Sequence, residues 1–158
     1  MPEFLTTSVN VMLPDLHATK KEEVIKKLCD KALENGYVDK LFYDDLIARE
    51  KEFPTGLDTS IPMAISHVGT HCLKSFLALA TLQEPVEFEN MDGSEKKVFA
   101  GMVFVFGIVR PEEQVVVLRK LSGMFQEPEY LERIMKSKTP DALLAVMSEF
   151  LGDMLCVE

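Results

Sequence analysis

Apolar and polar residues alternate with two different periods along this chain, and the periods predict where strands and helices lie. Residues 4–13, FLTTSVNVML, place apolar or β-branched side chains at every second position, which predicts a first strand. From residue 19 onward the apolar positions recur at helical spacing. Thr19 and Glu22 have the spacing of a capping box at the start of this predicted helix, and Gly36 is suited to end it.

A second helix and several strands are predicted next. Asp39 can cap the helix, which Pro54 stops after about Glu52, so that Arg49 falls in its last turn. The extended segments that follow are predicted at 63–66, 76–82 and 86–88, with a turn at MDGS.

The most apolar tract of the chain is residues 98–109, VFAGMVFVFGIV. Apolar residues at nearly every position are typical of a central strand that is buried on both faces. Its 12 residues are too few to cross a bilayer, so no direct membrane insertion is expected.

The C-terminal third is predicted to be helical. Pro111 suits a first helical position, and the two glutamates after it favour the positive end of the helix dipole. Pro128 begins a shorter helix, and the TPD sequence at 139–141 begins a last one that runs to about Leu155. The predicted order β-α-α-β-β-β-α-α-α indicates an α/β fold, and the length is typical of one domain over residues 1–158.

Charge and cysteine content narrow the class of function. The chain has 17 Lys+Arg and 26 Asp+Glu residues, and a net charge of −9 argues against broad nucleic-acid binding, which requires positive charge. No basic segment followed by an apolar one opens the sequence, so no signal peptide is expected and we predict a cytoplasmic protein. Cys29, Cys72 and Cys156 are widely separated, which fits reduced thiols better than disulfides or zinc ligands.

His67 and His71 are the candidates for chemistry. As a metal site they lack a third ligand, and Gly69 between two β-branched residues disfavours a helix that would align them. Each histidine could instead be a packed or solvated residue without a chemical role. A third interpretation is covalent catalysis, because a neutral imidazole can carry a phosphoryl group. Arg49 and Gln114 are residue types that can bind phosphoryl oxygens.

Two motifs at this spacing resemble a known family. LIAREKEFPTGL at 46–57, followed by AISHVGTHCLKSF at 64–76, resembles the fructose/mannitol-type (type-2) IIA component of the phosphoenolpyruvate-dependent sugar phosphotransferase system, which carries RE-x(2)-FPTG and then AIPH motifs. A P-V-x-F-x-x-MDG segment at 85–93 extends the resemblance over nearly the whole chain. The resemblance implies a mannitol-type EIIA fold, in which helices flank both faces of a mixed β-sheet.

The resemblance also implies roles for individual residues. His67 matches the phosphoacceptor, which forms a tele-phosphohistidine intermediate, and Arg49 matches the arginine that stabilises the phosphoryl group. His71 resembles a second histidine that is often found just after the first, so it is a possible orienting residue. Gln114 falls where fructose- and mannitol-like members have another histidine. Galactitol-type members resemble this chain in having glutamine there, which points to the galactitol-like subgroup.

Ser66 departs from the family pattern, which usually has proline directly before the active histidine. Proline would restrict its own φ and favour extended geometry in the residue before it. Serine relaxes that restriction and adds a hydroxyl group. We expect the site to survive, because the nucleophile itself remains.

The resemblance implies a relay between proteins, with no cofactor and no metal. His67 would accept a phosphoryl group from the phosphocarrier HPr and pass it to a cysteine of the EIIB component, which serves the EIIC membrane permease during sugar uptake. A regulatory protein that is phosphorylated but acts by binding another protein is the alternative. A binding domain that has lost the chemistry is a third hypothesis.

Overall fold

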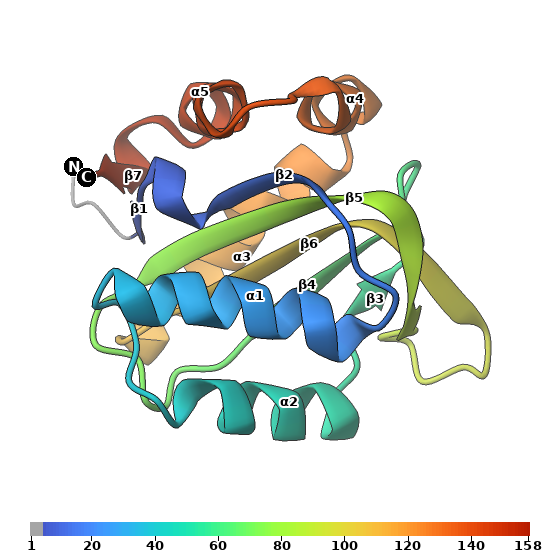
Figure 1. Ribbon diagram of the computed structural model, residues 1–158, viewed down its shortest axis with the longest axis horizontal. Coiled ribbons are helices and arrows are strands. Elements are labelled where there is room, and N and C mark those ends of the chain that lie inside the picture. Colours follow the sequence, from blue (N-terminus) through green and yellow to red (C-terminus); the bar gives the residue numbers. More distant parts are fainter. Residues whose placement is uncertain (1–4) are drawn as a thin grey trace.

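One mixed β-sheet with helices on both faces forms the molecule, as a computed structural model shows for residues 5–158 (Figure 1). Helices α1 and α2 cover one face, and α3, α4 and α5 cover the other. This arrangement confirms the predicted fold class. No helix within the described part of the chain is long and apolar enough to span a bilayer.

The described residues form seven strands. They are β1 (Leu5–Thr7), β2 (Met12–Leu16), β3 (Gly56–Leu57), β4 (Met63–His67), β5 (Phe76–Glu89), β6 (Lys97–Gly107) and β7 (Leu155–Val157). The sheet order is β3-β4-β6-β5-β1-β7, and β2 pairs with a further part of β5.

The helices fall between the strands or after them. They are α1 (Lys21–Glu34), α2 (Phe42–Glu52), α3 (Pro111–Phe125), α4 (Pro128–Lys136) and α5 (Pro140–Leu151). Two short 3-10 helices, η1 (Val9–Val11) and η2 (Gly152–Met154), complete the described part of the chain.

The strand directions bring distant segments to one edge of the sheet. Strands β4 and β6 run parallel, and His67 at the end of β4 lies beside Phe106 near the end of β6. Strand β5 is antiparallel to β6, so it begins at this same edge with Phe76 opposite Gly107. Ends of strands in α/β sheets are where sites are commonly built, because the loops there are free of ladder hydrogen bonds.

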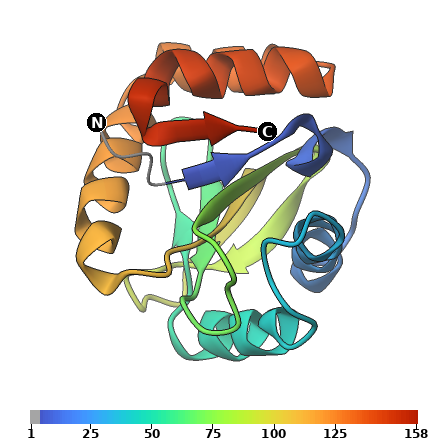
Figure 2. The same ribbon diagram turned by 90° about the vertical axis from the view of Figure 1, so that its left-hand side faces the viewer.

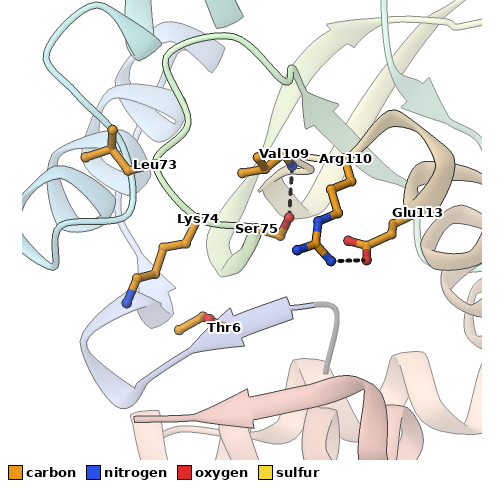
Figure 3. A pocket seen from close by; sticks show the side chains of 7 residues that line it. All are labelled: Thr6, Leu73, Lys74, Ser75, Val109, Arg110 and Glu113. Atoms are coloured by element: carbon orange, nitrogen blue, oxygen red, sulfur yellow. Dashed lines mark hydrogen bonds and ion pairs between the residues drawn. The ribbon is translucent and has the colours of Figure 1, made fainter. Parts of the chain in front are cut away.

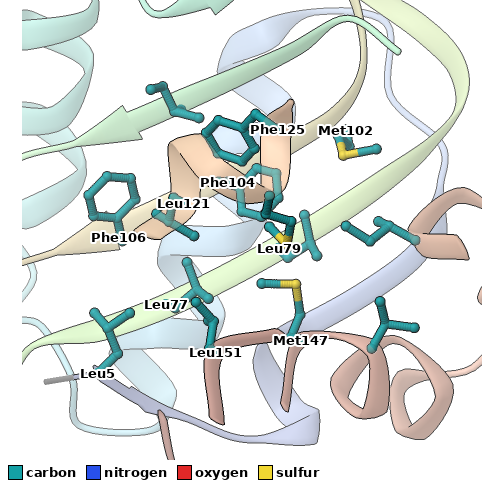
Figure 4. Close-up of a cluster of buried hydrophobic side chains, with 14 of the residues drawn as sticks. Leu5, Leu77, Leu79, Met102, Phe104, Phe106, Leu121, Phe125, Met147 and Leu151 are labelled. Carbon is teal, nitrogen blue, oxygen red and sulfur yellow. The ribbon is translucent and has the colours of Figure 1, made fainter. Parts of the chain in front are cut away.

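Two buried clusters hold the helices on the sheet. Successive side chains of a strand point to opposite faces of the sheet, so alternate residues of β4 belong to different clusters. Met63 and Ile65 pack under α3–α5, and Ala64 packs under α1 and α2. Figure 4 shows the first cluster, where Phe104 and Leu79 of the sheet meet helical side chains such as those of Phe125 and Met147.

The predicted first strand is interrupted, which corrects the sequence-based expectation for residues 5–13; residue 4 lies outside the described residues. The 3-10 helix η1 separates β1 from β2. Thr6 pairs with Phe76 and Met12 pairs with Leu79. The N-terminal segment therefore has more residues between its two pairing positions than β5 has between the same two positions. The 3-10 helix η1 accommodates the extra residues. The alternation of apolar and polar residues in the sequence does not indicate such an interruption.

The helix boundaries confirm some predicted caps and correct others. Gly36, at a φ of 76°, follows α1, and the amide of Tyr37 donates to the carbonyl of Ala32 at 3.0 Å, as in a Schellman motif. The predicted box of Thr19 with Glu22 is wrong, because the Thr19 hydroxyl donates to Glu23 instead.

Asp39 does not cap its helix as predicted, whereas α5 begins where the TPD sequence predicts. Asp39 lies two residues before the N-cap Leu41 and accepts the Leu41 amide, so it closes a turn ahead of α2 and does not cap the helix. The last helix begins at residues 139–141 as predicted, and Thr139 caps it, because the Thr139 hydroxyl accepts the amide of Ala142 at 3.1 Å.

Strands β5 and β7 also differ from the sequence expectation. The segments predicted at 76–82 and 86–88 form the one strand β5, with an irregularity in pairing between Thr81 and Val86. The last helix ends at Leu151, earlier than predicted, and the chain then forms β7 beside β1 (Figure 2). Three residues are too few for a periodic signal, so only the pairing with β1 identifies β7.

Candidate functional site

The imidazole of His67 is held by a backbone carbonyl at the end of β4. Its Nδ1 atom lies 2.8 Å from the carbonyl oxygen of Ile65. A carbonyl oxygen can only accept a hydrogen bond, so Nδ1 carries the proton in the neutral ring. The other nitrogen, Nε2, then presents a lone pair, which is the form that a nucleophilic histidine requires.

Burial of the His67 ring favours its neutral form. The ring stacks on Phe106 of the neighbouring strand, with centroids 4.6 Å apart and planes at 6°. Burial lowers the pKa of His67 below its ordinary value, and the positive charge of Arg49 acts in the same direction. The hydrogen bond with the carbonyl of Ile65 and the negative charge of Glu50 oppose this decrease. A lowered pKa favours the form of the ring in which one nitrogen is unprotonated.

His67 and Arg49 line the same pocket, a hollow of about 380 Å³. Its other walls come from the end of α2, the loop after it and the turn after β5: Glu52, Phe53, Pro54, Thr55, Met91, Asp92 and Gly93. The guanidinium of Arg49 lies 4.8 Å from the Phe53 ring, which supports it from one side. Helix α2 therefore presents a cation and β4 presents an imidazole to one open cavity, a combination suited to a phosphoryl group.

A buried carboxylate lies behind this pocket. Glu50 is 3% exposed, and its Oε1 atom accepts the hydroxyl of Ser66 at 2.6 Å and that of Thr55 at 2.7 Å. Its Oε2 atom accepts the backbone amide of Thr55 at 2.9 Å. Three donors therefore satisfy a charge that would otherwise be costly to bury.

His71 takes up a different position from His67. Its Nδ1 atom lies 2.9 Å from Asp39, and its Nε2 atom lies 3.6 Å from Asp45. The hydrogen bond with Asp39 raises the pKa of His71. His71 does not line the pocket of His67, and it adopts a φ of 59°, unusual for a residue with a side chain. Its contacts fix the loop after β4 to α2.

Gln114 lies in the first part of α3, which begins shortly after β6 ends. It is partly buried, makes no side-chain hydrogen bond within residues 5–158, and does not line the pocket of His67. A separate hollow lies beside the start of α3, where Arg110 points toward Glu113 and the Val109 amide donates to the Ser75 hydroxyl (Figure 3). The described geometry thus brings Arg49 to His67 and leaves His71 and Gln114 outside that cavity.

Sequence reasoning missed the residues that support the histidine. Glu50 and Thr55 stood inside the recognised RE-x(2)-FPTG motif, but the sequence assigned them no role. Their burial as polar residues is the signal that only the structure supplies. Phe106 was part of an apolar strand, and nothing in that pattern indicated a stacking partner for His67.

Comparisons with known proteins find relatives in sequence and in fold. The family model described as phosphoenolpyruvate-dependent sugar phosphotransferase system, EIIA 2, matches residues 4–150. The galactitol-specific EIIA component of Escherichia coli K12 is 30% identical over 116 residues, covering 72% of this chain and 77% of that protein. A nitrogen regulatory protein of Bradyrhizobium diazoefficiens is 24% identical over 154 residues, covering 94% and 95%.

A solved structure shares the fold. The complex of enzyme IIAMTL and phosphorylated enzyme IIBMTL from Escherichia coli contains a chain with a TM-score of 0.75 and 23% identity, covering 92% of this chain and 99% of that one. At this level of identity the match establishes the arrangement of strands and helices.

Proposed function

The chain belongs to the EIIA 2 family of the phosphoenolpyruvate-dependent sugar phosphotransferase system, and on this premise we propose that His67 is its phosphoryl-carrying residue. Family membership gives the chain a phosphocarrier role in that system. The observation that carries the assignment to His67 is the bond from Nδ1 to the carbonyl of Ile65, which leaves Nε2 unprotonated in a pocket with Arg49.

The proposed relay has two displacements at phosphorus. The Nε2 lone pair attacks the phosphoryl group of phosphorylated HPr; a P–N bond to His67 forms as the P–N bond to the HPr histidine breaks. A cysteine thiolate of EIIB then attacks the same phosphorus, so that a P–S bond forms and Nε2 recovers its lone pair. Throughout, Nδ1 keeps its proton and donates it in a hydrogen bond to the carbonyl of Ile65.

Arg49 is proposed to stabilise the phosphoryl oxygens during both displacements. It lines the pocket beside His67 and is exposed, so it can turn toward an incoming group. Phe53 and Met91 at the walls of the pocket are 52% and 46% exposed, which gives a protein partner apolar surface to contact. Burial raises the pKa of Cys29 to about 12 and that of Cys72 to about 11, so these thiols stay protonated and are poor acceptors.

Galactitol or a related carbohydrate is the proposed sugar. The similarity to a galactitol-specific EIIA component and the glutamine at position 114 support this choice. We propose that EIIC, through EIIB, is the permease served. We also propose that the chain is one EIIA type-2 domain over residues 1–158 and acts in the cytoplasm.

A regulatory role is the second candidate. The nitrogen regulatory protein of Bradyrhizobium diazoefficiens matches a larger share of this chain than the galactitol-specific component does. A regulatory protein would be phosphorylated on the same histidine but would act by binding another protein. Phosphotransfer to a panel of EIIB proteins separates the two roles, because only a transport component passes the group onward to one of them.

The experiment that tests the assignment compares the two histidines. The protein is mixed with phosphoenolpyruvate, enzyme I and HPr, and its mass is measured for the gain of one phosphoryl group. His67→Ala should take up no label, because the nucleophile is gone. His71→Ala is the matched control and should still be labelled. Full labelling of His67→Ala contradicts the assignment, and no labelling of a well-folded wild type with cognate HPr favours a binding domain without chemistry.

A further inference from the structure

The buried carboxylate of Glu50 connects three of the segments that build the pocket. Glu50 follows Arg49 in α2, Thr55 lies in the loop that forms a pocket wall, and Ser66 directly precedes His67 in β4. Both Thr55 and Ser66 donate their hydroxyls to the same oxygen, Oε1. The two hydroxyl oxygens themselves lie 3.4 Å apart, so the cluster is compact.

The same cluster continues to the ring of His67 through the backbone. The carbonyl of Thr55 accepts the amide of Ile65 at 3.3 Å, and the carbonyl of Ile65 accepts Nδ1 of His67 at 2.8 Å. Residue 65 is therefore held through its backbone by the loop after α2, and residue 66 is held through its side chain by Glu50 of α2 itself. A shift of this loop would move the carbonyl that sets the tautomer of His67.

We propose that Glu50, Thr55 and Ser66 form a hydrogen-bonded anchor that positions His67 for phosphotransfer, and that the Ser66 hydroxyl replaces the proline usual in the family. The inference rests on the proposed function of His67. These three are positioning residues, because they act through the backbone of β4 and the pocket wall and do not touch the phosphoryl group.

The physical basis is that a strand end can be fixed in two ways. Proline fixes its own φ through its ring. A serine leaves φ free, but a short hydrogen bond from its hydroxyl to a buried carboxylate fixes the residue from outside. At 2.6 Å the Ser66 bond is in the range of hydrogen bonds to ionised acceptors, which are about twice as strong as neutral ones. Ser66 is 1% exposed, so water does not compete for the bond.

The rate test removes one donor at a time. Ser66→Ala deletes a hydroxyl, and Thr55→Val deletes the other while keeping the shape of the side chain. Each should lower the rate of phosphorylation by HPr by about tenfold, because small displacements of reacting groups cost large factors in rate. Thr55→Ser keeps the hydroxyl and should therefore retain most of the wild-type rate of phosphorylation.

A matched control distinguishes the expected loss of phosphorylation rate from a general effect of removing a buried serine hydroxyl. Ser137 is 7% exposed, and its hydroxyl donates to the carbonyl of Arg133 at 2.8 Å, at the end of α4 on the other face of the sheet. Ser137→Ala should lose stability as Ser66→Ala does, yet keep the wild-type rate. The anchor is overturned if Ser66→Ala and Thr55→Val both fold and both keep the wild-type rate.

A spectroscopic readout tests positioning without phosphotransfer. Nitrogen-15 NMR of the imidazole reports which nitrogen carries the proton. In the wild type we expect Nδ1 protonated, and in Ser66→Ala a larger fraction of the ring with the proton on Nε2. An unchanged tautomer in both donor variants overturns the proposal even if rates fall. If the wild type is not phosphorylated at all, the proposed function fails, and the tautomer measurement still decides on the anchor.

Discussion

His67 and His71 are four residues apart, but their surroundings are opposite. His67 sits at the end of a strand, stacked on Phe106 and hydrogen-bonded to the backbone carbonyl of Ile65. His71 sits in a loop between the carboxylates of Asp39 and Asp45. Burial lowers the pKa of the first, and the hydrogen bond with Asp39 raises the pKa of the second.

The difference shows how surroundings assign roles to identical side chains. A nucleophile needs a free lone pair and a nearby cation, and His67 has both. His71 uses its ring nitrogens to contact two acids, so it serves to hold the loop that follows the site. The negative charge beside His71 would also repel a phosphoryl group, whereas Arg49 beside His67 would attract one.

The largest expected effect comes from removing the cation on the His67 side. Arg49→Ala should reduce the rate of phosphorylation by about 100-fold, the loss typical of one group that stabilises developing charge. The variant should remain folded, because Arg49 is exposed. Rapid-quench measurement of phosphoprotein formation gives the rate.

Lys51→Ala is the matched control for Arg49→Ala. Lys51 lies in the same last turn of α2 but does not line the pocket of His67. A loss of rate as large as that of Arg49→Ala would show that general charge, and not position, attracts the donor.

A smaller effect is expected on the His71 side, from Asp39→Asn. Asparagine keeps an acceptor for the amide of Leu41 but removes the nearer of the two negative charges beside His71, while Asp45 remains. By proton NMR titration the pKa of His71 should fall toward its ordinary value of 6.5, while that of His67 stays below 6.5. A change in the titration of His67 alone would contradict the separation of the two sites.

The same variant predicts a pH-dependent change in stability. A raised pKa means that protonated His71 stabilises the fold below its unfolded pKa, and this contribution is lost as the pH rises through the folded pKa. Asp39→Asn should therefore lower Tm more near about pH 5.5 than near about pH 8.5. Asp30→Asn breaks an ion pair with Lys26 that contains no histidine, and its effect should not vary over this range.

The smallest effect is expected from Gln114→His, which tests whether α3 contributes to the His67 side. Gln114 does not line the pocket, so we expect the rate of phosphorylation to change by less than about threefold. The same phosphorylation assay measures it. A larger gain would show that a ring donor at this position reaches the phosphoryl group in the complex with a partner.

Much of this molecule could be predicted from periodicity and motif spacing. The helix-ending Gly36, the helix start at residues 139–141 and the strand at residues 63–66 follow from local residue preferences, which depend on near neighbours in the chain. The interruption of the first strand and the existence of β7 did not follow, because strand pairing is a contact between segments far apart in sequence. Ser66 looked like a loss of rigidity, and the structure provides it with a partner in Glu50.

The sequence by itself determined the order of most elements, the α/β class and the pair of motifs that contain Arg49 and His67. Only the tertiary structure decided that the carbonyl of Ile65 orients His67, that Glu50 is buried among three donors, and that His71 turns toward two acids. The physical reason is that tautomer, pKa and hydrogen-bond partner depend on which groups surround a side chain in space. Residue identity limits what a histidine can do, and the fold selects which of those properties it has.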